Sequence, residues 1–322
     1  MKKSFSRIVL AAMCLWMLQG SAFAAELLIP GGQVIGLQLC NDTVTVAAFD
    51  DVLGSDSKAA GLQVGDEILS VAGRTIKTAQ DVCDALDRSD GSVELRVNRC
   101  GKEKKLKIKP RITDRGPRLG VYLRDGITGI GTVTWYDPET GKFGTLGHGV
   151  NDGKGQLLEM MGGKAYDAQV AAVKKGVSGE PGQLKGAVAA GQEVGKLYRN
   201  TQQGVFGTSE RGWKGEVLPV GEPEDVRTGP AVIRSTVSGD AVREYSVEIL
   251  KIYPRSRSDG RNLLLKVTDP ALLEATGGIV QGMSGSPIIQ DGKLVGAVTH
   301  VLVNDPTTGY GIFIENMLDA AA

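Results

Sequence analysis

Histidine is scarce in this chain: its 322 residues include only His148 and His300. Any reaction that needs an imidazole base must therefore use one of these two. Aromatic residues make up only 5% of the chain, and neither sign of charge dominates, because 37 Lys and Arg balance 37 Asp and Glu. Such a balance provides no field that would attract nucleic acid. No nucleic-acid-binding motif is present, and we expect neither a nucleic-acid partner nor a cofactor.

Cysteine is also rare, with four in the whole chain. Cys14 falls in the N-terminal segment described below, which leaves an odd number, Cys40, Cys83 and Cys100. One disulfide with one free thiol and three unpaired thiols are both compatible with this count. No pair has the spacing of metal ligands and no histidine lies near them, so we expect no metal site.

The chain lacks an apolar run long enough for a comfortable membrane-spanning helix, which needs about 20 residues. Residues 1–24 combine a basic start with an apolar stretch from Ile8 to Leu18 and a small-residue end, Ala22–Ala24. This pattern predicts a secretory signal that is cleaved before Ala25, and hence an exported protein. An uncleaved membrane anchor is the alternative.

Glycine, by contrast, is abundant: 45 of 322 residues, about twice the usual fraction of roughly 7%. Together with the few aromatics, this favours many short strands joined by tight turns. The length suggests two domains. From residue 118 onward, strand-like segments recur in a pattern that suits a pair of small β-barrels: 119–123, 131–136, 168–173, 231–237, 243–250, 263–267, 287–289, 294–301 and 312–314.

Residues 34–109, which follow a short extension at 25–33, show a compact α+β pattern. Thr78 and Asp81 form a capping box that predicts the start of a short helix. Strands are expected before and after it, at 34–39, 44–49, 93–97 and 105–109. Prolines and alternating charges at 110–117 then predict a linker to a domain at 118–322.

The run Ala60-Gly-Leu62, followed by Gly65-Asp-Glu-Ile-Leu69 and Gly73, resembles the PDZ domain. The resemblance implies that an extended peptide binds as an added strand between a sheet edge and the helix. By position, the residues that would line this groove are Gly32, Ile35, Gly36, Leu37, Val82 and Leu86. The alternative is that these residues belong to the core.

One stretch near the C-terminus, Gly282–Pro287, has the form G-x-S-G-x-P. Its glycines allow a sharp turn in which the N–H groups of Gly282 and Ser284 point together at one developing oxyanion. Ser284 is therefore the predicted nucleophile of an acyl-transfer reaction. An ordinary turn between two strands is the alternative.

A serine nucleophile needs a base. His148 is flanked by glycines and follows the predicted strand 131–136, which suits exposure at the rim of a sheet. His300 lies inside an alternating strand, where a histidine is more often structural. We therefore assign the base to His148. Since His148 and Ser284 fall in different halves of the second domain, we expect the site in the cleft between two barrels.

Four motifs resemble the stage IV sporulation protein B peptidase family: Leu146-Gly-His-Gly149, Lys266-Val-Thr-Asp-Pro270, the segment 277–288 and the segment 298–306. The resemblance implies a mainly β fold, in which a PDZ-like domain precedes a chymotrypsin-like double β-barrel. It also implies Ser284 as nucleophile, His148 as base and Asp269 as the acid that orients the imidazole. Asp152 is a rival for that last role. The alternative for Asp269, which precedes Pro270, is that it only forms part of a turn.

By the same resemblance, the chain is an exported serine endopeptidase that acts between the forespore and mother-cell membranes. Such enzymes cleave themselves near the N-terminus and cut a membrane-bound regulator, which leads to activation of a late sigma factor. The expected partners are this protein substrate and the chain's own N-terminal segment. A non-catalytic PDZ-type regulator with an inactive peptidase-like scaffold is the alternative function.

Overall fold

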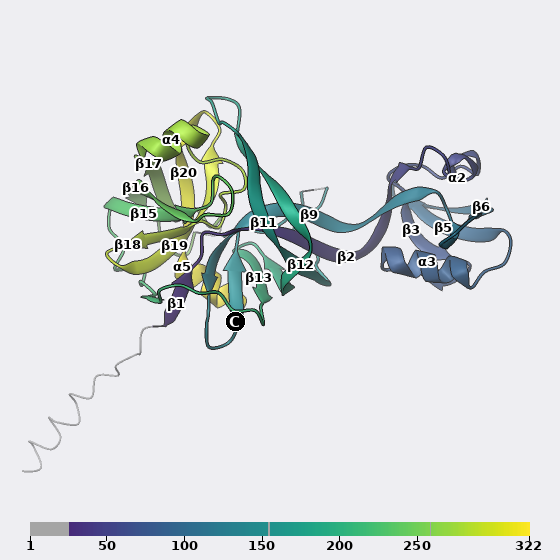
Figure 1. The fold of residues 1–322 in the computed structure, drawn as a ribbon, viewed down its shortest axis with the longest axis horizontal. Coiled ribbons are helices and arrows are strands. Elements are labelled where there is room, and N and C mark those ends of the chain that lie inside the picture. The colour runs from purple at the N-terminus through teal and green to yellow at the C-terminus, as the bar shows by residue number, and fades with distance from the viewer. Residues whose placement is uncertain (1–25, 154, 258) are drawn as a thin grey trace, which may run out of the picture.

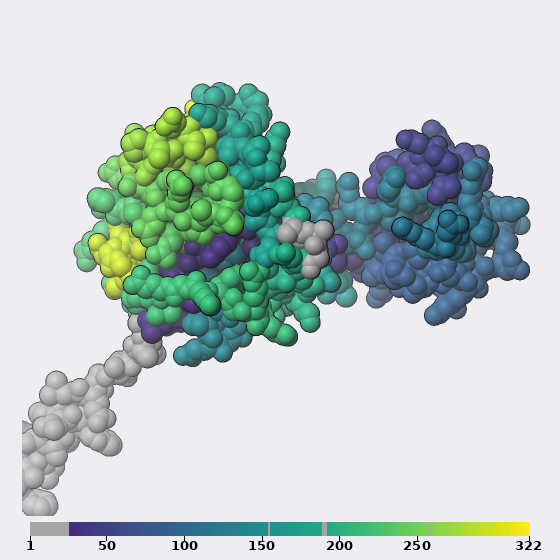
Figure 2. All heavy atoms as spheres, viewed as in Figure 1, coloured from purple at the N-terminus to yellow at the C-terminus, as the bar shows by residue number. Residues whose placement is uncertain are grey.

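A computed structural model describes residues 26–322, apart from 154 and 258. Two β-rich halves pack together, and a smaller lobe is joined to them by a narrow neck (Figures 1 and 2). The predicted fold class, a PDZ-like unit with a chymotrypsin-like double β-barrel, is confirmed. The predicted signal at 1–24 lies outside the described residues. No described helix has the length and apolarity to cross a membrane.

The second barrel is closed, and its strand order is β15 (Gly229–Ser235), β16 (Arg243–Ile252), β17 (Leu263–Val267), β20 (Asp305–Phe313), β19 (Lys293–Leu302) and β18 (Pro287–Gln290). Alternating residues of β15 and β16 are buried, as expected for strands with one face on a core. The buried side chains include Ile233, Val247 and Leu265. Helix α4 (Pro270–Thr276) follows β17, and α5 (Ile314–Ala321) ends the chain.

The first barrel is a ring whose order is β9 (Val121–Tyr136), β10 (Lys142–Thr145), β13 (Gly204–Thr208), β12 (Gln183–Thr201), β11 (Gly162–Lys174) and β2 (Val34–Phe49), closed by pairing of β2 with β9. Phe143 and Val205 are fully buried in its core. Strand β1 (Leu27–Pro30) extends this sheet beside β9, and β14 (Leu218–Pro219) pairs with β1.

The small lobe is the PDZ-like unit, and its own core includes Val44, Leu86 and Leu95. The predicted capping box is present: the Thr78 side chain accepts from Asp81 N–H, and the Asp81 side chain accepts from Thr78 N–H. The lobe includes the end of β2 and the start of β9. The elements between these two strands along the chain are α2 (Ser55–Ala59), β3 (Glu67–Val71), β4 (Arg74–Thr75), α3 (Ala79–Asp87), β5 (Val93–Arg99), β6 (Lys102–Ile108), β7 (Arg111–Thr113) and β8 (Gly116–Arg118).

The PDZ-like lobe is an insertion into the first barrel, and this corrects the predicted domain boundaries. Strands β2 and β9 both run through the neck, so that each belongs to the barrel at one end and to the lobe at the other (Figure 1). Cys40 and Gly126 are paired where the two strands leave the barrel. The sequence pattern of β2 looks like two separate strands because its two halves face different cores.

The predicted linker at 110–117 is also wrong, because these residues form most of the hairpin β7–β8. Arg111 in this segment and Arg118 just beyond it form ion pairs with the lobe. Arg111 binds Asp56 at 2.8 Å, and Arg118 binds Asp87 at 3.4 Å. All three cysteines, Cys40, Cys83 and Cys100, are free thiols, which decides the question that their number left open.

Candidate active site

The loop that carries Ser284 precedes β18 and depends on two glycines with left-handed backbone. Gly282 has φ +100° and Gly285 has φ +95°, a region that other residues rarely adopt. A Cβ at Gly285 would lie 2.1 Å from the Thr132 carbonyl oxygen of β9. Only glycine therefore permits the close approach of this loop to the first barrel.

Thr132 holds the same loop from the side of the first barrel. Its Oγ1 donates to the carbonyl of Gly282 at 2.9 Å, and its N–H donates to the carbonyl of Ser284 at 3.0 Å. The backbone N–H groups of Gly282 and Ser284 donate to no acceptor in the described part of the chain. They are the two donors that the sequence predicts for an oxyanion hole.

The Ser284 side chain is half-buried, and its hydroxyl donates to the Thr299 carbonyl of β19 at 2.8 Å. In this structure the hydroxyl is therefore bonded to the second barrel and not to a histidine. Rotation about one side-chain bond would release it, since a serine hydroxyl can occupy three staggered positions.

His148 follows β10 in a tight turn, where Leu146 and Gly147 have φ of 70° and 67°. This turn packs directly against the nucleophile loop and β19. A Cβ at Gly285 would lie 2.5 Å from Leu146 N, and a Cβ at Gly147 would lie 2.9 Å from Thr299 Cγ2. The structure therefore brings the loops of His148 and Ser284 together at the junction of the two barrels, where the sequence predicted the site.

The His148 ring is held in one tautomer by its own backbone. Its Nδ1 lies 2.9 Å from the Gly149 carbonyl oxygen. Because a carbonyl can only accept, Nδ1 carries the hydrogen and Nε2 keeps its lone pair. Burial lowers the pKa of His148, although the Gly149 hydrogen bond opposes this. The imidazole is therefore neutral near pH 7, which is the state that a general base requires.

His300 lies beside His148, with ring centroids 5.2 Å apart and planes at 40°. Its Nδ1 is buried and has no hydrogen-bond partner in the described chain. Burial and the neighbouring His148 lower the pKa of His300 to about 4. Sequence patterns do not indicate this pair, because the two histidines are distant in the chain and only the packing of the barrels brings them together.

Asp269 has a structural role. Its carboxylate caps α4 by accepting from Leu272 N–H at 3.0 Å, and it also accepts from Ser246 N–H at 3.3 Å. The structure shows no contact between Asp269 and His148. The rival Asp152 accepts from Gln156 N–H at 3.0 Å through Oδ1. An orienting role for a carboxylate stays a prediction, and the partner observed at His148 Nδ1 is the Gly149 carbonyl.

Four residues predicted to line the peptide groove belong to the first barrel instead. Ile35 and Leu37 are buried in its core, and Gly36 pairs with Ile130 and Tyr166. The Gly32 N–H donates to the Val133 carbonyl of β9 at 2.8 Å, and a Cβ at Gly32 would meet Arg234 of the second barrel. The prediction was wrong because the barrel half of β2 has the same apolar alternation as a lobe strand.

The lobe nevertheless has a groove, between α3 and the first residues of β9. Its volume is about 480 Å³, and its walls include Val82, Cys83 and Leu86 of α3 and residues 119–123. The predicted Val82 and Leu86 therefore lie at the groove, although both are almost fully buried. The opposite wall comes from a strand that the sequence assigned to the peptidase domain.

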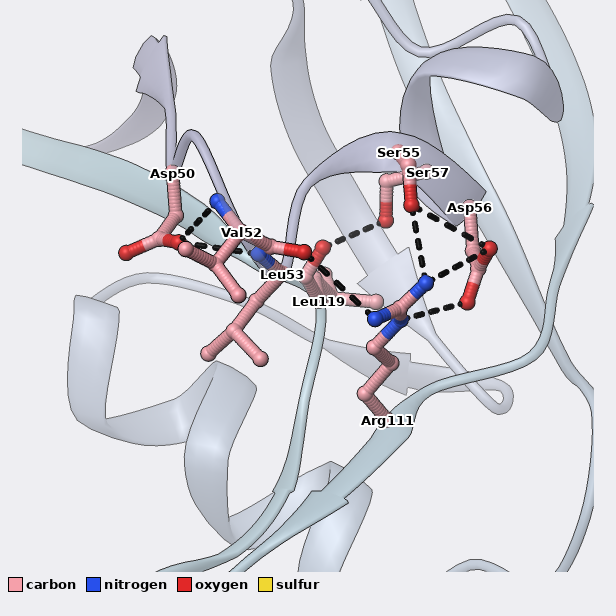
Figure 3. A network of polar contacts seen from close by, with 8 residues as sticks. All are labelled: Asp50, Val52, Leu53, Ser55, Asp56, Ser57, Arg111 and Leu119. Atoms are coloured by element: carbon pink, nitrogen blue, oxygen red, sulfur yellow. Dashed lines mark hydrogen bonds and ion pairs between the residues drawn. The ribbon is translucent and has the colours of Figure 1, made fainter.

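A polar network fixes the loop at the end of this groove (Figure 3). Ser57 Oγ donates to the Leu119 carbonyl at 2.6 Å, and Asp50 N–H donates to the Gly120 carbonyl at 2.9 Å. With both carbonyls held, the N–H groups of Leu119 and Gly120 have no acceptor among the described residues. Both residues line the groove.

Comparisons with known proteins agree with this architecture. The model of the SpoIVB peptidase S55 family matches residues 115–318, and a PDZ-domain model matches residues 54–99. The fold and the two matches define a peptidase that contains a PDZ domain. The first match covers more than half of this chain. The chain therefore belongs to the SpoIVB peptidase S55 family.

Three individual proteins show weaker similarity. A Bartonella henselae protein named a zinc metalloprotease is 28% identical over 130 residues, which are 38% of this chain and 36% of that protein. The PDZ domain of an SdrC-like protein from Listeria monocytogenes covers 26% of this chain and 90% of its own, with 26% identity and a TM-score of 0.23. The match with the inactive form of the Rv3671c protease of M. tuberculosis covers 60% of this chain and 82% of that protease chain, with 13% identity and a TM-score of 0.34.

The chain thus spans about a third of the length of that metalloprotease. Among the residues that the structure describes, no group of three or more His, Cys, Asp or Glu side chains is arranged to hold a metal ion.

Proposed function

We propose that this peptidase is a serine endopeptidase, with Ser284 as nucleophile and His148 as general base. The observation that carries this proposal is the meeting of the two loops: Gly285 packs on Leu146, and Gly147 packs on Thr299. Nε2 of His148 accepts the hydroxyl proton as Oγ attacks the peptide carbonyl, and later returns it to the leaving amine. The free N–H groups of Gly282 and Ser284 stabilise the oxyanion.

The hydrogen bond from Ser284 to Thr299 defines the resting state of this mechanism. When an extended substrate binds along β19, a substrate N–H donates to the Thr299 carbonyl instead. The hydroxyl then rotates toward His148. Membership of the family supports a serine mechanism. It also supports Asp269 as the orienting acid, whereas the hydrogen bonds of Asp269 support a helix cap alone, and the substitutions that separate these two roles are given below.

The nucleophile assignment is tested with a fluorophosphonate, which labels an activated serine covalently. We expect labelling of the parent chain and loss of labelling in Ser284→Ala and His148→Ala. Ser55→Ala, in the PDZ-like lobe, is the control and should label like the parent. Labelling that persists in Ser284→Ala would refute the assignment.

Ser284 bonded to a backbone carbonyl also fits the second candidate, a peptide-binding regulator without catalytic activity. The same experiment separates the two. A folded parent chain that neither labels nor cleaves a denatured protein substrate supports the regulator.

We also infer that the groove between α3 and β9 binds the C-terminus of an extended peptide. Residues 121–124 of β9 pair with β2 on one edge, and their other edge faces the groove without a described strand partner. A peptide would add there as a strand, with its carboxylate at the N–H groups of Leu119 and Gly120. Apolar side chains of α3 would contact its last residues.

Cys83 offers a direct test of the groove, because it lines the groove wall and is only half-buried. Cys83→Trp should fill the space and abolish binding of a fluorescent peptide with a free carboxyl end. Cys100→Trp, at an exposed turn, is the matched control and should bind like the parent. Equal binding of the peptide and its C-terminal amide would contradict carboxylate recognition.

The cellular part of the proposal follows from the family. We propose an exported enzyme that acts between the forespore and mother-cell membranes, cleaves its own N-terminal segment and cuts a membrane-bound regulator of a late sigma factor. Strand β1 limits where the first cut can occur: Leu28 is 0% exposed and pairs with β14. Self-cleavage of the folded chain is therefore expected before residue 27.

Mass spectrometry of the chain from its own cells tests this directly. The parent should begin close to residue 25, and Ser284→Ala should keep any segment that only self-cleavage removes. A parent that starts at residue 1 would support the uncleaved anchor. A start within residues 28–30 would contradict the limit set by β1.

A further inference from the structure

Arg261 differs from the other arginines of its loop. Arg257 donates to both oxygens of Asp259, at 2.6 and 2.9 Å, and Arg255 pairs with Glu315 and Asp319. The Arg261 side chain, in contrast, makes neither a hydrogen bond nor an ion pair within the described residues. Its Nε is buried without a partner. A buried donor that lacks an acceptor is costly, which makes a missing ligand a natural explanation.

The position of Arg261 connects it to the catalytic histidine. Its guanidinium lies 5.3 Å from the ring centroid of Tyr310 on β20. Tyr310 is paired with His300 across β19 and β20, so the two side chains share one face of the sheet. His300 in turn contacts the ring of His148. A second buried nitrogen without a partner, His300 Nδ1, lies in this same cluster.

The adjacent edge of β19 is where a substrate would lie. Strand β18 pairs with β19 only as far as Ala297, and the nucleophile loop covers the edge at Val298 and Thr299. From His300 to Leu302 no described strand pairs on this side. An extended peptide that adds antiparallel to this edge has its scissile carbonyl at Ser284 and its preceding residues beside 300–302.

We propose that Arg261 is a specificity residue, which binds an acidic side chain of the substrate on the acyl side of the scissile bond. A carboxylate suits this site because a guanidinium pairs with it through two parallel hydrogen bonds. Asp259 is already engaged: both of its oxygens accept from Arg257, and Oδ1 also accepts from the Arg261 backbone N–H at 3.2 Å, while the Arg261 guanidinium makes no bond to it. The inference rests on the proposed serine peptidase function and adds a preference for Asp or Glu.

Cleavage-site profiling of the full chain provides the first test. A denatured protein mixture is digested, and the residues around each cut are counted. We expect enrichment of Asp and Glu at one or two positions that precede the cut. A profile without acidic enrichment on that side would overturn the proposal, whatever the variants do.

A matched peptide pair, with Glu or Gln at the enriched position, gives the second test. The ratio of kcat/KM for the two peptides should be about 10 to 100 in the parent, as for a charge-assisted hydrogen bond. It should fall to about 1 in Arg261→Gln and favour a Lys peptide in Arg261→Glu. Arg255→Gln, whose partners lie within the chain, is the control and should keep the parent's ratio.

Fluorophosphonate labelling separates failure of this inference from failure of the proposed function. A parent that labels but shows no preference for the Glu peptide loses the specificity role and keeps its serine mechanism. A parent that does not label loses both. An Arg261→Gln variant that labels and keeps the full Glu preference assigns that preference to another residue and overturns the proposal.

Discussion

At the scale of single residues, the environment of His148 determines the pH range over which this proposed base is neutral. Burial lowers its pKa below the ordinary value of 6.5, so the neutral, reactive form persists into mildly acidic solution. We expect the acid limb of kcat/KM for a peptide substrate to have an apparent pKa below 6.5. An acid limb at or above that value would show that the imidazole is more exposed or faces a carboxylate.

His300 makes the folded state sensitive to acid. Its pKa of about 4 is below the unfolded value of 6.5, so the unfolded chain takes up the proton first as the pH falls. Stability is therefore retained above about pH 6.5 and lost as the pH falls from there toward 4. Urea unfolding at a series of pH values should show this loss, and His300→Phe should reduce it. An equally steep loss in the variant would assign it to other groups.

Asp269 can be tested by two substitutions that separate its roles. Asparagine is also a good N-cap, so Asp269→Asn should keep α4 and change turnover by no more than about threefold, whereas Asp269→Ala should cost about 1 kcal/mol of stability. Thermal unfolding and peptide turnover measure the two effects. A loss near 10⁴-fold in Asp269→Asn would instead show that the carboxylate orients the base.

At the scale of elements, β9 connects the peptide groove to the catalytic loop within one strand of 16 residues. Its first residues form the groove wall, and Thr132 near its other end holds the carbonyls of Gly282 and Ser284. A peptide added to the groove edge would therefore contact the same strand that holds the loop of Ser284. Sequence patterns identify Thr132 only as part of a strand, because its partners are about 150 residues away.

Thr132→Val removes the side-chain donor to Gly282 and keeps the shape and the backbone bond. We expect kcat to fall about 10-fold with little change in KM, because one oxyanion donor loses its support. Thr134→Val is the matched control on the same face of β9. The Thr134 hydroxyl is buried without a partner, so its removal should leave kcat unchanged and stability equal or higher. Equal effects of the two variants would contradict a specific role for Thr132.

Local signals predicted some elements well and others poorly. The β17 segment was predicted with its observed bounds, since apolar residues bounded by turn residues define it, and the capping box placed α3. The 19-residue strand β12 was not predicted, because its Ala- and Gly-rich sequence has no clear alternation. Ser284 and His148 were recognisable from their glycines. The His148–His300 contact, the Thr132 tether and Arg261 depend on packing between distant segments.

At the scale of the whole molecule, the lobe is inserted between two paired strands of the first barrel, β2 and β9. It can therefore be deleted without removing the barrel part of either strand. Cys40 and Gly126 face each other on antiparallel strands at the neck. Replacing residues 41–125 with a two-residue Asn-Gly turn should therefore join β2 and β9 in a hairpin. We expect a folded protein that reacts with a fluorophosphonate and no longer binds the C-terminal peptide.

The matched comparison is a deletion of residues 34–109, the boundaries that the sequence alone suggests. This deletion removes the half of β2 that closes the first barrel between β9 and β11, so it should unfold the His148 side of the site. Circular dichroism and labelling together distinguish the two deletion variants. If the chain without 41–125 folds but does not label, the lobe contributes to assembly of the catalytic loop, and β9 is the element through which it acts.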